Sequence, residues 1–175
     1  MRTMLPVLLA LTTVELASGL VLDTFQSTLL RYPSLLVLVP VTIGMAGNLG
    51  SILAARLSTA FHLGLLDFAP DDDLLLGNAV ATVALSLTLF PLVGAGAWLI
   101  QTFLAGTALG FLTVVAVAAV SGAVLALLAI VVTLVATYAA YRLELDPDDV
   151  VIPVVTNTCD VLGVLVLFGV VRLLV

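Results

Sequence analysis

One stretch decides the fold of this chain, Pro153-Val154-Val155-Thr156-Asn157-Thr158-Cys159-Asp160, which interrupts an apolar run between Val150 and Val175. Asp146 and Pro147 predict that a helix starts before it, because Asp is a good N-cap and Pro fits the first helical position. Asp160 lies 14 residues after Asp146. This is roughly 21 Å along a helix axis, past the middle of a hydrocarbon core about 30 Å thick. A carboxylate there costs on the order of 2.5–3.5 kcal/mol, so we expect it to face protein, water or an ion rather than lipid.

The polar residues of this segment share one face of the predicted helix. Spacings of three and four bring together Asp149, Pro153, Thr156, Asp160 and Gly163, and Asn157 borders them. Pro153 has no N–H, so it frees a backbone carbonyl oxygen and predicts a kink. The oxygen-rich face favours an ion or proton path. The alternative is a helix interface in which Asp160 is protonated or hydrogen-bonded to another helix.

The composition is that of an integral membrane protein. Of 175 residues, 63% are hydrophobic and only 9% are charged, and the mean hydropathy is +1.36, far above that of soluble domains. The net charge of −6 argues against nucleic acid or anionic lipid as a partner. The single cysteine, Cys159, excludes an intrachain disulfide and is expected to serve packing.

The first predicted span, 4–30, carries two carboxylates. Glu15 would lie near mid-span, and Asp23 follows it at helical spacing on the same polar stripe. Either residue could bind a second ion or a proton. The alternative is that each lies near a membrane interface, where a carboxylate costs little, and this alternative is weaker for Glu15 than for Asp23.

The second predicted span, 34–62, has an unusual middle section with a proline and three glycines. Each glycine costs roughly 1 kcal/mol of helix propensity relative to Ala, so the run needs a physical reason. Either small residues allow another helix to approach closely, or the helix unwinds so that carbonyls line a cavity. The residues concerned are Pro40, where a kink is expected, and Gly44, Gly47, Asn48, Gly50 and Ser51.

The rest of the chain predicts three further spans, which gives an all-α bundle in one membrane domain over residues 1–175, with no soluble domain. The five expected helices are 4–30, 34–62, 74–93, 107–141 and 147–174. Most acidic residues lie in two short segments, 67–73 and 144–149, and five spans place Tyr32 and Trp98 on one side of the membrane and these two acidic loops on the other. Arginines divide three to two in favour of the side that holds the N-terminus, which predicts a cytoplasmic N-terminus.

Two separated motifs resemble the membrane domain of the MgtE family of magnesium transporters. The run from Pro40 to Ser51 is similar to the family's second-helix pattern of Pro-Val, Gly-Met and Gly-Gly-Asn. The second motif is similar to the family's fifth-helix pattern and runs from Leu145-Asp146-Pro147 through Pro153 and Thr156 to Asp160-Val161-Leu162-Gly163. The resemblance covers about 170 residues. This sequence departs from the pattern at Ala46, Ile52 and Ile152, where members carry Gly, Gln and Asn.

The resemblance implies a homodimer with an ion path near its two-fold axis and Asp160 as the ion-binding aspartate. It also implies that the cytosolic magnesium-sensing domains of bacterial members are missing from these residues. The expected metal-site residues are Asp160, Asn157, Thr156, Asn48, Gly47, Asp23 and Glu15, and the expected helix-packing residues are Gly44, Gly50, Ser51 and Gly163. Mg²⁺ takes oxygen ligands and keeps much of its water, so carboxylates with hydroxyl and amide oxygens suit it.

The sequence therefore predicts transport of a divalent cation, Mg²⁺ first, across a cell membrane. One alternative is a half-pore subunit that needs a second five-helix chain, which the changes at Ile52 and Ile152 favour. A remote alternative is an intramembrane enzyme acting on lipid, but the chain has one His, one Cys and no paired catalytic groups within a span. We therefore expect no enzymatic activity.

Overall fold

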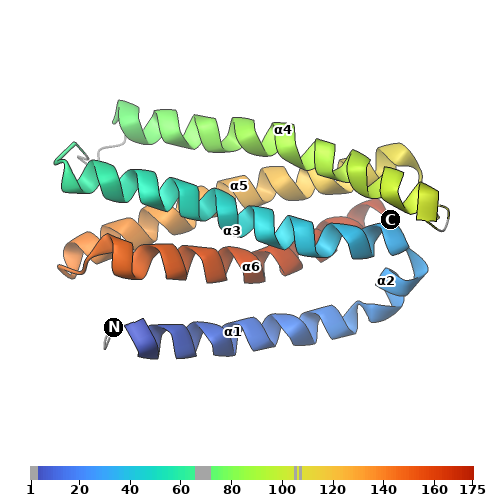
Figure 1. Cartoon of the computed structure of the whole chain (residues 1–175), viewed down its shortest axis with the longest axis horizontal. Helices are drawn as coiled ribbons and strands as arrows, with labels where there is room; N and C mark the ends of the chain where they lie inside the picture. The colour runs from blue at the N-terminus through green and yellow to red at the C-terminus, as the bar shows by residue number, and fades with distance from the viewer. Residues whose placement is uncertain (1–3, 66–71, 105, 107) are drawn as a thin grey trace.

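The computed structural model describes residues 4–65, 72–104, 106 and 108–175, and this part of the chain is all-helical (Figure 1). Its six helices are α1 (Met4–Thr24), α2 (Gln26–Arg31), α3 (Pro33–His62), α4 (Asp73–Leu104), α5 (Phe111–Arg142) and α6 (Pro147–Leu174). Two starts have a clear chemical cause. Asp72 accepts hydrogen bonds from the first backbone N–H groups of α4, at 2.8 Å from Leu74, and α6 begins at Pro147 as predicted.

Helices α3 to α6 form the bundle, and the shorter α1 lies against one side of it. Helix α3 contacts α4, α5 and α6, whereas α1 contacts α6 and, at its end, α2. Figure 1 shows α3 to α6 side by side with their connections at alternating ends, and α1 running along the α6 side of the bundle. Helices α3, α5 and α6 therefore all contact one another, and α1 reaches the bundle through α6.

The bundle has two apolar clusters. The first lies toward the end that holds α2 and the C-terminus, and its fully buried members include Leu35, Leu38, Val117 and Leu167. The second lies beside the middle of α3 and α6 and is built from smaller residues, among them Ala46, Ala129, Val155 and Cys159. The thiol of Cys159 is buried and unpaired with another cysteine, which agrees with a packing role.

Four helices are long and apolar enough to cross a membrane: α3, α4, α5 and the 149–174 part of α6. The predicted count of five spans is therefore not confirmed within the described residues, because α1 is not among the four. Large apolar side chains cover the outer surface of these helices, for example Leu99, Leu112 and Leu127. Such a surface is what a lipid environment accepts.

Three predicted helix boundaries are wrong. The expected helix 4–30 is divided at Phe25, whose backbone (φ −100°, ψ 3°) separates α1 from α2. The expected helix 74–93 continues to Leu104, because Gly94 packs against the backbone of Val115 in α5 and that contact offsets the glycine propensity cost. Helix α5 begins at Phe111 rather than residue 107.

Candidate functional site

Glycines allow α3 and α6 to pack closely. A Cβ placed on Gly50 would lie 2.5 Å from Cγ1 of Val155, and one placed on Gly163 would lie 3.2 Å from Cα of Ile43. Both glycines thus lie at close contacts between the two helices, one glycine on each helix. Helix α3 stays continuous through its glycine-rich middle, so local unwinding does not occur there, and close packing against α6 accounts for Gly47 and Gly50.

Asp160 lies at this α3–α6 contact, opposite Gly47. A Cβ at Gly47 would lie 2.7 Å from Oδ1 of Asp160 and 3.2 Å from Cγ2 of Thr156. Gly47 is buried, whereas Asp160 and Thr156 are half-buried on α6. The carboxylate therefore occupies the space that a side chain at position 47 would take, and the structure brings together three of the predicted metal-site residues.

Glu15 is a fourth predicted residue that lies near this point. It is half-buried on α1, and α1 packs against α6, the helix that carries Asp160. Two half-buried carboxylates thus lie on two helices that are in contact. Like charges in a poorly solvated place repel, so this arrangement favours binding of a cation or a proton.

The other predicted ligands are arranged differently. Asn157 is half-buried, and its Nδ2 donates to the carbonyl oxygen of Pro153 at 2.8 Å, which leaves its amide oxygen as the group that can accept. Asn48 is exposed on α3. Asp23 is exposed and lies eight residues beyond Glu15, about 12 Å along the axis of α1. Neither of these last two is shown to join the contact around Asp160.

Within the described residues, no group of three His, Cys, Asp or Glu side chains is close enough to hold a metal ion. Asp149 is exposed at the start of α6, 11 residues before Asp160, so it lies at the end of the polar face and not at its centre. Any ion bound beside Asp160 would have to retain water or gain ligands from elsewhere.

The remaining predicted packing and kink residues lie on α3 and α6. Gly44 has no atom of the described chain within 4 Å of its added Cβ, so no helix of this chain packs on it. Ser51 is half-buried and donates to the carbonyl oxygen of Asn48 at 3.1 Å. Pro40 and Pro153 both lie inside helices that continue past them, and the kinks expected there stay predictions.

Buried hydroxyl groups near this contact were missed by sequence reasoning. Thr133 of α5 is fully buried, and its hydroxyl lies 3.5 Å from the carbonyl oxygen of Gly50 as a donor. Thr42 on α3 is fully buried too, and its hydroxyl has no hydrogen-bond partner within the described part of the chain. Single Thr residues in apolar helices carry no pattern that would predict which helix they face.

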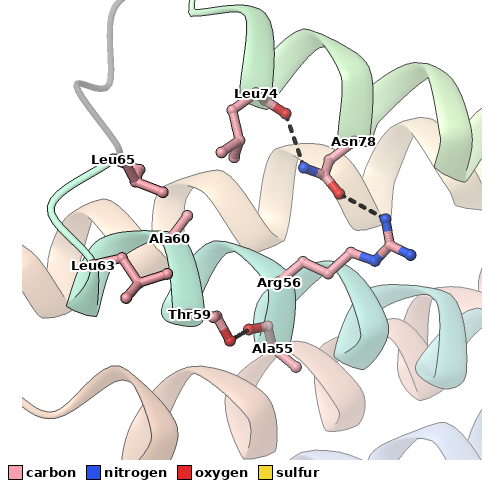
Figure 2. A pocket seen from close by; sticks show the side chains of 8 residues that line it. All are labelled: Ala55, Arg56, Thr59, Ala60, Leu63, Leu65, Leu74 and Asn78. Atoms are coloured by element: carbon pink, nitrogen blue, oxygen red, sulfur yellow. Dashed lines mark hydrogen bonds between the residues drawn. The ribbon is translucent and has the colours of Figure 1, made fainter.

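A separate cavity of about 410 Å³ lies between α3 and α4, near the connection of these helices (Figure 2). Figure 2 shows Arg56 of α3 reaching across to Asn78 of α4, whose Oδ1 accepts a hydrogen bond of 3.2 Å. Asn78 in turn donates to the carbonyl oxygen of Leu74 at 2.9 Å. These hydrogen bonds join α3 to α4 and hold the guanidinium of Arg56, so we interpret the polar groups of this cavity as part of the contact between the two helices. The described lining of the cavity contains no carboxylate.

Residues 39–170 match the MgtE family model, which is described as a divalent cation transporter. The chain belongs to the MgtE family of divalent cation transporters. The match begins in α3 and extends into the last turns of α6, so it includes both Gly47 and Asp160. MgtE is a family of transporters and not of enzymes, and with four membrane-length helices the chain is a multi-pass membrane protein.

Proposed function

We propose that this MgtE-family chain carries Mg²⁺ across the membrane as a dimer, with a partly hydrated ion held beside Asp160. One observation carries the proposal: Gly47 of α3 leaves room for Oδ1 of Asp160 on α6, the helix against which α1 with Glu15 packs. Half-buried carboxylates inside an apolar bundle cost free energy unless a cation, a proton or hydrogen bonds compensate their charge. A divalent cation would offset the repulsion between the two carboxylates.

Mg²⁺ fits this chemistry better than softer metals. It prefers oxygen ligands and gives up its water reluctantly, so one or two carboxylates with surrounding hydroxyl and amide oxygens are sufficient. Asp160 would bind the ion or its water directly, and Glu15 would add charge. The hydroxyl of Thr156 and the amide oxygen of Asn157 would hydrogen-bond the water shell. Gly47 would contribute space and no ligand.

The dimer is supported by an open face on α3. Pro40, Gly44, Asn48 and Ile52 are exposed, and nothing in the described chain lies within 4 Å of an added Cβ at Gly44. A second copy packed there would bury apolar surface and bring a second Asp160 toward the first. It would also bring Asn48 toward the ion's water shell. A cytoplasmic N-terminus is part of this proposal and rests on the distribution of arginines.

The deciding experiment measures Mg²⁺ uptake into proteoliposomes that hold only this chain. Asp160→Asn and Asp160→Ala are compared with the wild type at equal protein density. Glu144→Gln is the matched control, because it also removes one negative charge but from an exposed position between α5 and α6. We expect both Asp160 variants to lose uptake about tenfold or more, since a lost charged ligand costs over 1.4 kcal/mol, and Glu144→Gln to keep it.

Uptake by Asp160→Asn at the level of the control would refute the role of Asp160. Absence of Mg²⁺ uptake by the wild type would favour the second candidate, a half-pore subunit that pairs with a different chain. One observation supports that candidate: Ile52, which departs from the family's Gln, is 50% exposed on the open face of α3. Uptake that appears only when a second five-helix chain is added would establish it.

A further inference from the structure

We propose that a cavity where α2 meets the end of α6 binds a phosphate group, supplied by a phospholipid headgroup or by a soluble phosphate. The cavity measures about 280 Å³. Its polar and aromatic lining comes from the end of α1, from α2 and from α6, and consists of Thr24, Phe25, Thr28, Arg31, Tyr32 and Arg172. This site does not depend on the proposed transport function.

Two guanidinium groups line the cavity from different helices, each held over an aromatic ring. Cζ of Arg172 lies 4.7 Å from the centroid of the Phe25 ring, and Cζ of Arg31 lies 5.3 Å from that of Tyr32. Within the part of the chain that the structure describes, neither arginine has a carboxylate oxygen within 4.0 Å. Two like charges on one cavity repel, and a bound anion would offset that repulsion.

The donors present suit phosphate in particular. The planar guanidinium offers paired N–H groups that match phosphate oxygens. The hydroxyl groups of Thr28 and Tyr32 can donate to the same anion, whereas the hydroxyl of Thr24 already donates to the carbonyl oxygen of Val21 at 2.7 Å and is left as an acceptor. The volume also allows for bridging water, since one water takes about 30 Å³.

The position of the cavity makes a lipid phosphate accessible. It lies at the bundle end that holds α2 and the C-terminus, and Tyr32 there is a typical headgroup-zone residue. Of the described carboxylates, Glu144, Asp146 and Asp149 lie at the opposite end, where α5 leads into α6 (Figure 1), whereas Asp23 is exposed on α1 directly before Thr24. The net charge of −6 argues against a general attraction to anionic lipid, but two of the five arginines line this one cavity.

The test measures the thermal unfolding midpoint of the purified full chain in a neutral detergent. Three probes are titrated: phosphatidylglycerol, diacylglycerol with the same acyl chains, and inorganic phosphate. Wild type is compared with Arg31→Gln, Arg172→Gln and the double variant. Arg142→Gln is the matched control, since it removes an arginine from the last turn of α5 at the other end of the bundle. Thr28→Val, which keeps both charges, serves if an arginine variant does not fold.

We expect phosphatidylglycerol to raise the midpoint of the wild type and of Arg142→Gln, and diacylglycerol to raise it far less. Each single variant should weaken the apparent affinity about tenfold, and the double variant should abolish the shift. A shift with inorganic phosphate alone that the double variant loses would assign a soluble anion as the ligand. The proposal is overturned if neither phosphate probe shifts the wild type, or if the double variant responds as Arg142→Gln does.

Discussion

Position 47 shows how a residue without a side chain can control a charged one. Gly47 is buried against α6, and its missing Cβ leaves the space that Oδ1 of Asp160 occupies. Glycine at this position costs α3 roughly 1 kcal/mol of helix propensity relative to Ala, and its missing side chain leaves room for a carboxylate. The resemblance to a metal-transport motif placed Gly47 among the predicted metal-site residues. In the structure, Gly47 leaves space for the carboxylate of Asp160.

Gly47→Ala is expected to displace Asp160, because a Cβ at 2.7 Å from Oδ1 is closer than such atoms approach. Overpacking of this kind costs about 1–3 kcal/mol of unfolding free energy, and Mg²⁺ uptake should fall at least about tenfold. Uptake into proteoliposomes and unfolding in mixed detergent measure the two effects.

Gly169→Ala is the control for this prediction. It lies on α6, the same helix as Asp160, and an added Cβ there has no neighbour within 4 Å. It should leave uptake unchanged and preserve or slightly raise stability. If Gly47→Ala transports as well as Gly169→Ala, the contact between α3 and Asp160 has no part in transport.

At the scale of the helices, the break between α1 and α2 is fixed by a stack of side chains. The rings of Phe25 and Phe168 lie 4.0 Å apart at 12°, and the guanidinium of Arg172 lies over the Phe25 ring. Phe168 is itself buried in the first apolar cluster. Because α1 meets no bundle helix other than α6 within the described residues, this stack is one of the main anchors that hold Glu15 near Asp160.

Phe25→Ala should loosen α1 and α2 from α6. A buried Phe→Ala change costs about 3–5 kcal/mol, and about 2 kcal/mol is expected here because Phe25 is only half-buried. Hydrogen exchange should rise over residues 4–31 and much less over α5. Phe103→Ala is the matched control, since Phe103 on α4 is 81% exposed. Equal exchange in the two variants would show that the stack does not anchor α1.

At the scale of the whole molecule, the open face of α3 predicts assembly. Gly44→Leu places a large side chain where this chain has no neighbour within 4 Å, so each subunit should keep its fold and helix content. A second copy packed closely on that face would be pushed away. We expect the dissociation constant of the dimer to rise at least about tenfold, and Mg²⁺ uptake to fall as the dimer is lost.

Light scattering of the purified chain in detergent measures this assembly. Gly77→Leu on α4 is the control, because its added Cβ also has no neighbour within 4 Å. A wild type that is monomeric at every concentration, or a Gly44→Leu variant as dimeric as Gly77→Leu, would contradict the dimer on α3.

The sequence by itself determined the membrane class, the helical fold and the start of α6. It also predicted Asp160 as a site residue, and the family resemblance added Gly47. These follow from local rules: long apolar runs need helices, Asp-Pro starts one, and a carboxylate at membrane depth needs a reason. Such rules depend only on residues that are close together in the chain, so these predictions required no knowledge of the neighbouring helices.

Only the tertiary structure decided where α1 breaks and how far α4 extends. It also decided that the space at Gly47 is filled by Asp160 and Thr156, and that Arg31 shares a cavity with Arg172. Each of these depends on which faces of two helices meet. Periodicity fixes the faces of one helix but not its rotation against the next, and the packing of small and large side chains fixes that rotation.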